Sequence, residues 1–200
     1  MANMRTMAAV FQKLRMLRTD ARGTAAIEFA LTGLMLALGL MNAVDVGLYA
    51  YRRMEVENSA EAGAQAAWKT CSNQSSMLPA TKLNASTGLP NCPGPNVTPT
   101  LNAAITSAIQ STSLGTAVSL ASGYPAEGYY CVNLSNVLQS VGSLSSKPAN
   151  CAAAGNAATA PGDFIQVQVT YAYQPLFSGL TVMNALGISS ITKTAWMRLG

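Results

Sequence analysis

The sequence has no histidine, and only 10% of its 200 residues are charged. Without histidine the chain lacks the commonest general base and a frequent metal ligand. It also contains no GxSxG nucleophile motif and no phosphate-binding glycine loop. After residue 70 the only acids are Glu127 and Asp163, and we expect no clustered pair of carboxylates in the head. We therefore predict no enzymatic activity, no cofactor and no small-molecule substrate.

The few charges are unevenly distributed along the chain. Residues 1–23 contain five Lys or Arg and one Asp, so they account for the whole net charge of +4. Binding to nucleic acid is not expected, because it needs a basic face on the folded part of a protein. Basic clusters that precede an apolar helix tend to stay in the cytoplasm. Arg52 and Arg53 follow the helix, but Glu55 and Glu57 accompany them, so we expect the C-terminal part outside.

Residues 24–44 form an apolar segment, TAAIEFALTGLMLALGLMNAV, in which Glu28 is the only charge. About 20 apolar residues suffice for a helix to cross a bilayer, so the segment predicts a transmembrane helix. An acid within a membrane is costly and calls for a partner, unless its side chain snorkels to water. A secretory signal has a shorter apolar region without an acid, which disfavours a secreted head released by ordinary signal peptidase.

Helical periodicity continues beyond the apolar segment, and no proline interrupts residues 24–69. We predict one continuous helix with an amphipathic extension at residues 45–69. A break near Gly47 is the alternative, since glycine costs about 1 kcal/mol in a helix interior. One face of the extension collects mostly small residues, namely Val56, Ala60, Gly63, Ala64 and Ala67.

The junction RGTAAIEF at residues 22–29 carries a family resemblance. It resembles the processing pattern of Flp-type prepilins and of the TadE-like pseudopilins of tight-adherence pilus systems. The string ENSAEAGAQAAW at residues 57–68 is similar to the helix that follows in that family, so the likeness covers residues 1 to about 70. Gly33 departs from it, because many relatives have a proline near this position.

The resemblance implies a structural assembly subunit in the bacterial inner membrane, with a head in the periplasm or at the cell surface. A prepilin peptidase would cut between Gly23 and Thr24, and Glu28 with Phe29 would serve recognition and assembly. Implied partners are the membrane, this peptidase, other pilin or pseudopilin subunits and the pilus assembly platform. The alternative is an uncleaved single-span membrane protein whose outer head binds a partner or a cell-wall component.

Four cysteines, Cys71, Cys92, Cys131 and Cys151, all follow the apolar segment. An even number in an oxidising compartment predicts two disulfides, for which three pairings are possible. We favour Cys71 with Cys92 and Cys131 with Cys151, because each pair closes a loop rich in Pro or in Ser and Asn. A zinc site is disfavoured, since no pair has CxxC spacing.

The remaining residues predict a small α+β head. Thr98 and Pro99 give a helix-start signal for a helix that ends near Ser111. Strands are expected at residues 128–132, 163–173 and 188–199. The predicted fold is α+β and pilin-like, with an antiparallel sheet on the long helix. Its expected parts are a basic cytoplasmic leader (1–23), an apolar transmembrane helix (24–44), an amphipathic extension (45–69) and an extracytoplasmic disulfide-containing head (70–200).

Overall fold

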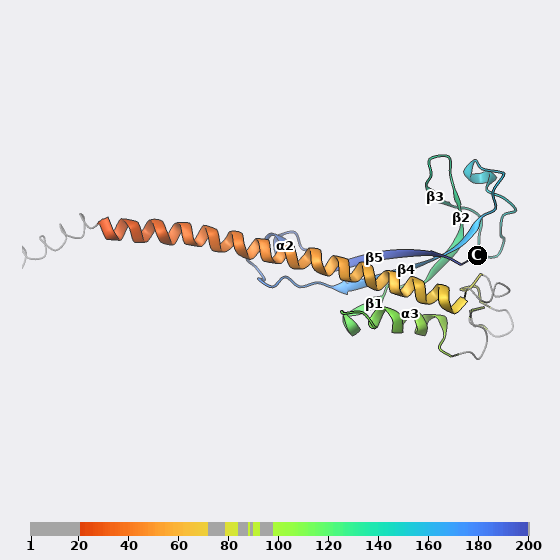
Figure 1. Cartoon of the computed structure of the whole chain (residues 1–200), viewed down its shortest axis with the longest axis horizontal. Helices are drawn as coiled ribbons and strands as arrows, with labels where there is room; N and C mark the ends of the chain where they lie inside the picture. The colour runs from red at the N-terminus through yellow and green to blue at the C-terminus, as the bar shows by residue number, and fades with distance from the viewer. Residues whose placement is uncertain (1–20, 72–78, 84–87, 89, 93–97, 200) are drawn as a thin grey trace, which may run out of the picture.

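The computed structural model describes residues 21–71, 79–83, 88, 90–92 and 98–199. One long helix runs the length of the molecule, and an antiparallel sheet with a short second helix packs against its C-terminal half (Figure 1). The elements in chain order are α2 (Ala21–Cys71), α3 (Leu101–Gln110), η2 (Gly115–Ala117), β1 (Val118–Leu120), β2 (Ala126–Val132), β3 (Leu138–Ser140), η3 (Ala152–Ala154), β4 (Gly162–Ala172), α4 (Val182–Ala185) and β5 (Ser190–Arg198).

Helix α2 is continuous over 51 residues, which corresponds to about 75 Å at 1.5 Å per residue. Its N-terminal part projects beyond the sheet, with nothing of the head beside it (Figure 1). The prediction of a single helix is confirmed, and there is no break at Gly47. A glycine costs about 1 kcal/mol, which the packing of the C-terminal half outweighs.

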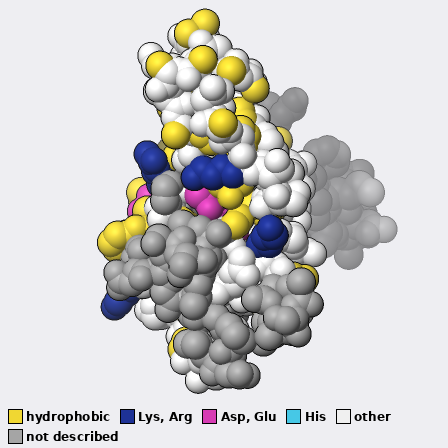
Figure 2. Space-filling view, turned by 90° about the vertical axis from the view of Figure 1, so that its right-hand side faces the viewer, with side chains coloured by type: hydrophobic (Ala, Val, Ile, Leu, Met, Phe, Trp, Pro, Cys, Tyr) yellow, Lys and Arg dark blue, Asp and Glu magenta, His cyan; other side chains and the backbone are white. Residues whose placement is uncertain are grey.

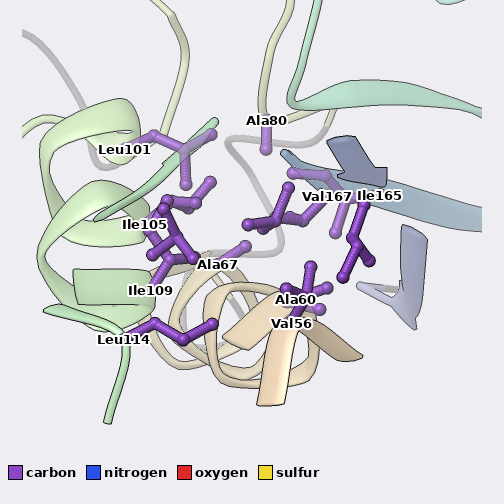
Figure 3. Close-up of a cluster of buried hydrophobic side chains, with 14 of the residues drawn as sticks. Val56, Ala60, Ala67, Ala80, Leu101, Ile105, Ile109, Leu114, Ile165 and Val167 are labelled. Carbon is purple, nitrogen blue, oxygen red and sulfur yellow. The ribbon is translucent and has the colours of Figure 1, made fainter. Parts of the chain in front are cut away.

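The C-terminal half of α2 buries the face that the sequence predicts. Val56, Ala60, Ala64 and Ala67 are fully buried against α3 and β4, as Figure 3 shows for the labelled residues of this core. Gly63 lies in the middle of this face, where an added Cβ would come within 2.7 Å of Ile109 and 3.0 Å of Val167. The small side chains therefore let the helix approach both neighbours closely.

Strand β4 lies at the centre of the sheet. It pairs with β5 from Phe164 to Ala172 on one side, and with β1 and β2 on the other, always antiparallel. Ile165, Val167 and Val169 are fully buried, and they alternate with half-exposed polar residues. The strand predicted for residues 163–173 is thus confirmed, because alternation with period 2 is what a sheet with one buried face requires.

Two features differ from what the sequence predicts. Strands β1 and β3 have three residues each, too few for a recognisable alternation. Helix α3 begins at Leu101, and its N-cap is Thr100, whose Oγ1 accepts a hydrogen bond from the amide of Ala103. Thr98 is therefore not the cap. Both threonines precede the same apolar run, so the choice depends on where the incoming chain turns.

Candidate functional site

The candidate processing junction lies at the start of the projecting part of α2. Gly23 and Thr24 are in the first turns of the helix, and both are exposed. Among the described residues, nothing outside the helix's own backbone lies within 4 Å of the position that a Cβ on Gly23 would take. No described residue outside the helix therefore packs on Gly23.

Glu28 and Phe29 lie just over one turn further along the helix. Both are exposed, and Phe29 has 81% of its surface free. Thr24 and Glu28 are four residues apart, so their side chains share one face of α2. The hydroxyl of Thr32 donates to the backbone carbonyl of Glu28 at 2.8 Å, which satisfies the threonine inside an apolar stretch. Glu28 is left as the one charge of this stretch.

The surface around these residues is apolar on all sides of the helix. Eight large hydrophobic side chains are exposed in this part, namely Ile27, Phe29, Leu31, Leu34, Met35, Leu36, Leu38 and Leu40. Of the described helices, this one is long and apolar enough to cross a membrane, and its apolar stretch is not buried in the head. A helix that is apolar all round requires cover by lipid or by other apolar helices.

Asp45 lies where the head is hydrogen-bonded to the middle of α2. It is fully buried. Its carboxylate accepts hydrogen bonds from the amide of Leu176 at 2.9 Å and from the hydroxyl of Thr181 at 2.6 Å. The hydroxyl of Tyr173 donates to its backbone carbonyl at 3.2 Å. These donors lie between β4 and α4, about 130 residues away in the sequence, so Asp45 ties the far end of the sheet to the helix.

The sequence does not predict this attachment, although it carries a signal. Asn42 lies one turn before Asp45, and its side-chain oxygen accepts from the amide of Val182 at 2.8 Å. Two polar residues at i and i+3 on the same face of an otherwise apolar helix indicate a polar contact. We name residues 174–189, which join β4 to β5 and are bound by these two side chains, the β4–β5 loop.

Further along α2, Glu55 connects the helix to the segment after α3. Arg52 donates to one carboxylate oxygen at 2.7 Å, and Ser113 donates to the other at 2.6 Å. Burial raises the pKa of Glu55, but the hydrogen bonds from Ser113 and Arg52 outweigh it and leave that pKa below its ordinary value. Ser59 adds a bond to the carbonyl of Ile109 at 2.7 Å. These contacts orient α3 on α2.

The two acids of the head, which are separate in the sequence, come together in the structure. Asp163 on β4 lies next to Glu127 on β2, so the expectation of no paired carboxylates is wrong. Neither carboxylate oxygen of Asp163 has a hydrogen-bond donor among the described residues, and the side chain is 2% exposed. Burial, followed by the charge of Glu127, raises the pKa of Asp163 to about 7.

The roles of these acids follow from their partners. Glu127 accepts hydrogen bonds from the amides of Ala80 and Thr81 and from the hydroxyl of Thr81, at 2.5 to 2.6 Å. It therefore holds the turn that precedes Cys92 against the sheet. Asp163 is sealed from solvent, which leaves it no route to a substrate. The described residues contain no group of three His, Cys, Asp or Glu that could hold a metal ion.

Two disulfides connect the head. Cys71, the last residue of α2, is bonded to Cys92, and Cys131 on β2 is bonded to Cys151. The pairings are the two local ones expected from the sequence. Cys71 and Cys92 belong to the main core, whereas Cys131 and Cys151 form a second small cluster with Tyr129, Val141 and Ala154. Each bond thus lies in a different part of the head.

The fold and the projecting helix define a pilin-like α+β protein, in whose described residues one apolar helix is long enough to cross a membrane. Residues 23–65 match the model of the family described as TadE-like protein. The match confirms the resemblance carried by the junction at residues 22–29. No curated protein and no solved structure matches the chain.

The matched segment contains Gly23, Thr24, Glu28 and Phe29, and also Asp45. A match over this N-terminal part of the chain supports a protein associated with tight-adherence pili. On the end of the molecule shown in Figure 2, the visible Lys and Arg side chains of the described residues lie apart from one another.

Proposed function

We propose that this chain is a TadE-like minor pilin or pseudopilin, a structural assembly subunit of a bacterial tight-adherence pilus system. The observation that carries the proposal is the apolar half of α2, which projects from the head without cover and has Glu28 as its one charge. Such a helix fits a bilayer while the subunit is stored, and it fits a bundle of similar helices in a filament.

In this proposal residues 1–23 are a basic leader that keeps the N-terminus in the cytoplasm. The head then lies outside the inner membrane, where the two disulfides form. A prepilin peptidase removes the leader between Gly23 and Thr24. This cut creates a new amine on Thr24, on the same face of the helix as Glu28.

The carboxylate of Glu28 then stabilises assembly through charge. A charge in an apolar environment is costly unless it is paired or protonated. The amine of Thr24, on this chain or on a neighbouring subunit, supplies the opposite charge. Pairing between subunits would select correctly processed partners, because the amine exists only after cleavage.

The first test is the position of the mature N-terminus, measured by mass spectrometry of protein expressed with its own peptidase. Thr24 is expected as the first residue of the wild type. Gly23→Leu should block cleavage, because the peptidase requires a small residue before the cut. Gly33→Leu is the matched control, since its Cβ also meets nothing within 4 Å, and it should be cleaved normally. An intact N-terminus in mature membranes favours the uncleaved single-span alternative.

The second test separates assembly from membrane insertion. Glu28→Gln should remain in the membrane and lose pilus output, because only the charge is removed. Glu28→Asp tests the reach of the carboxylate, and Thr32→Val is a control one turn away whose hydroxyl binds only its own helix among the described residues. Membrane level, cleavage and pilus output would be measured separately. Normal piliation by both Glu28 variants would leave the carboxylate as a snorkelling side chain without a role in assembly.

A further inference from the structure

The β4–β5 loop adds a further apolar surface to that of α2 among the described residues. No charged residue occurs between Asp163 and Lys193, an interval that includes the whole loop. Four aliphatic side chains of the loop are between 53 and 64% exposed, namely Leu176, Leu180, Val182 and Leu186. Met183 is buried in the main core, so the loop has an inner side that packs on the head and an outer side that does not.

The loop is held at the boundary between the two halves of α2. Its contacts are the hydrogen bonds from Leu176 and Thr181 to Asp45 and from Val182 to Asn42. In Figure 1 the connection between β4 and β5 extends along α2, past the end of the sheet, towards the projecting half of the helix. The loop is therefore the part of the head nearest to the apolar stretch.

The amides of the four exposed aliphatic residues meet a requirement of a lipid environment, where amides have no water to bind. The amides of Leu176 and Val182 donate to the side chains of Asp45 and Asn42. Those of Leu180 and Leu186 donate to the carbonyls of Phe177 and Val182. All four exposed aliphatic residues thus present apolar side chains on a backbone whose amides are already satisfied.

If α2 spans the bilayer as in the proposed function, the point at which the loop is bound to α2 gives the depth of the loop in the bilayer. Eighteen residues separate Thr24 from Asn42, which is about 27 Å of helix. The hydrocarbon core of a bilayer is about 30 Å thick. With Thr24 near the inner face, Asn42 and the loop bound to it reach the outer boundary of the hydrocarbon. Arg52 and Arg53 then lie about 15 Å further out, beyond the hydrocarbon.

We propose that the β4–β5 loop is a second membrane contact, whose four exposed aliphatic side chains enter the outer interface of the same bilayer that α2 crosses. The inference rests on the proposed function for the location of α2. Lipid is the occupant that the position favours, because the loop is continuous with the exposed apolar surface of α2. Two contacts, a span and a loop, fix the orientation of the head above the membrane, which a single helix leaves free to rotate.

The experiment uses tryptophan fluorescence in the full chain, reconstituted into phosphatidylcholine and phosphatidylglycerol vesicles with bromine either near the headgroup or near the end of the acyl chains. Trp68 and Trp196 are first replaced by Phe. Single tryptophans are then introduced by Leu186→Trp and, independently, by Leu180→Trp. Leu34→Trp reports on the span, and Leu134→Trp, which replaces a side chain 84% exposed after β2, reports on the part of the head away from the loop.

We expect quenching of Leu186→Trp and Leu180→Trp by bromine near the headgroup to exceed that of Leu134→Trp by at least about twofold, as for a side chain at the interface. Leu34→Trp should be quenched most by bromine deep in the chains. If Leu34→Trp is quenched but neither loop variant exceeds Leu134→Trp, the loop proposal is overturned and the span stands. If Leu34→Trp is not quenched, the span itself is wrong and both proposals fall.

A second copy of the chain is the other candidate occupant, and the same samples distinguish it. Acrylamide in the aqueous phase would then fail to reach the loop tryptophans, bromine would not quench them, and the protection would grow with the protein-to-lipid ratio. That pattern overturns lipid contact in favour of a subunit interface. Intact disulfides and an unchanged circular dichroism spectrum establish that each variant is folded.

Discussion

Asp45, Glu127 and Asp163 differ in the hydrogen bonds that their carboxylates receive. Asp45 receives two hydrogen bonds from the β4–β5 loop. Glu127 receives three from the turn at Ala80 and Thr81. Asp163 receives none among the described residues, and its pKa, raised to about 7, favours the protonated form below that pH. A buried carboxyl without donors is costly when it ionises, and the stability of the head should therefore depend on pH.

Asp163→Asn should remove this pH dependence. The pKa of Asp163 is raised from 3.8 to about 7, so between these pH values the folded state keeps a proton that the unfolded chain has lost. The free energy of unfolding of the wild type should therefore fall as pH rises from 4 to 7, by at most about 4 kcal/mol. The variant should show no such fall, and it should be the more stable protein at pH 8. Urea unfolding in detergent at several pH values measures both.

Glu127→Gln is the matched control for this experiment. Burial is the largest cause of the raised pKa and remains in this variant, while the second cause, the charge of Glu127, is removed. Part of the pH dependence should persist, together with a loss of stability at every pH from weaker bonds to Ala80 and Thr81. Equal pH profiles for the wild type and Asp163→Asn would contradict the assignment.

Gly63 and Gly47 form a matched pair in the same helix. Alanine at residue 63 would bring its Cβ within 2.7 Å of Ile109, whose branched side chain is packed in the core. Overpacking costs roughly 1–3 kcal/mol, and this exceeds the gain of about 1 kcal/mol in helix propensity. Gly63→Ala should lower the free energy of unfolding, and Gly47→Ala, which meets nothing within 4 Å, should raise it by up to about 1 kcal/mol. Urea unfolding of both variants tests this. Stabilisation by Gly63→Ala would contradict the prediction, because it would show that the side chains around residue 63 move to make room for the added methyl group.

At the scale of elements, α2 has two halves with different partners. The C-terminal half packs on α3, β4 and β5, and its core face consists of small residues and Val56. The N-terminal half makes no buried contact within its apolar stretch. Asn42 and Asp45 mark the boundary, because there the last segment of the head is bonded to the helix. The attachment of the β4–β5 loop thus depends on a few polar bonds.

Asp45→Ala should release this loop without unfolding the sheet. The buried hydroxyl of Thr181 and the amide of Leu176 lose their acceptor, and an unsatisfied buried group costs about 1–3 kcal/mol. Hydrogen exchange followed by mass spectrometry should show faster exchange in peptides from the loop and unchanged exchange in β4.

Asn42→Ala is the control for this variant, because it removes only the acceptor of Val182 and should increase exchange less. Equal protection of the loop in the wild type and in Asp45→Ala would show that apolar packing of Met183 holds the loop instead.

At the scale of the whole molecule, the head is small, and each of its two buried clusters contains a disulfide. Cys71–Cys92 connects the end of α2 to the turn that Glu127 binds, and Cys131–Cys151 belongs to the smaller cluster beside β2. A small core supplies limited stability on its own. The two disulfides therefore stabilise two separate buried clusters of the head.

Replacing either pair by serines should lower the free energy of unfolding by roughly 3 kcal/mol, since each closes a loop of about 20 residues. The two replacements should destabilise different parts of the head. Loss of Cys131–Cys151 should expose residues 133–161 to limited proteolysis while the packing of α2 on β4 persists, whereas loss of Cys71–Cys92 should weaken the main core. Thiol labelling of the exported wild type without reductant should find no free cysteine, and four reactive thiols would contradict the expectation.

The features that the sequence by itself determines are those that repeat locally. The continuous helix, its small-residue face at Val56 to Ala67 and the alternation at Ile165, Val167 and Val169 all follow from periods of 3.6 and 2 residues. The projecting apolar half of the helix follows from composition alone. The start of α3 was predicted two residues early, since Thr98 and Thr100 carry equivalent local signals.

Only the tertiary structure decides which distant residues meet. The bonds of Asp45 to the β4–β5 loop join positions more than 130 residues apart, and the pairing of Asp163 with Glu127 depends on the register between β4 and β2. The three-residue strands β1 and β3 acquire their structure from the strands beside them. No local sequence period predicts these contacts or these short strands, because they depend on how distant segments of the chain pack together.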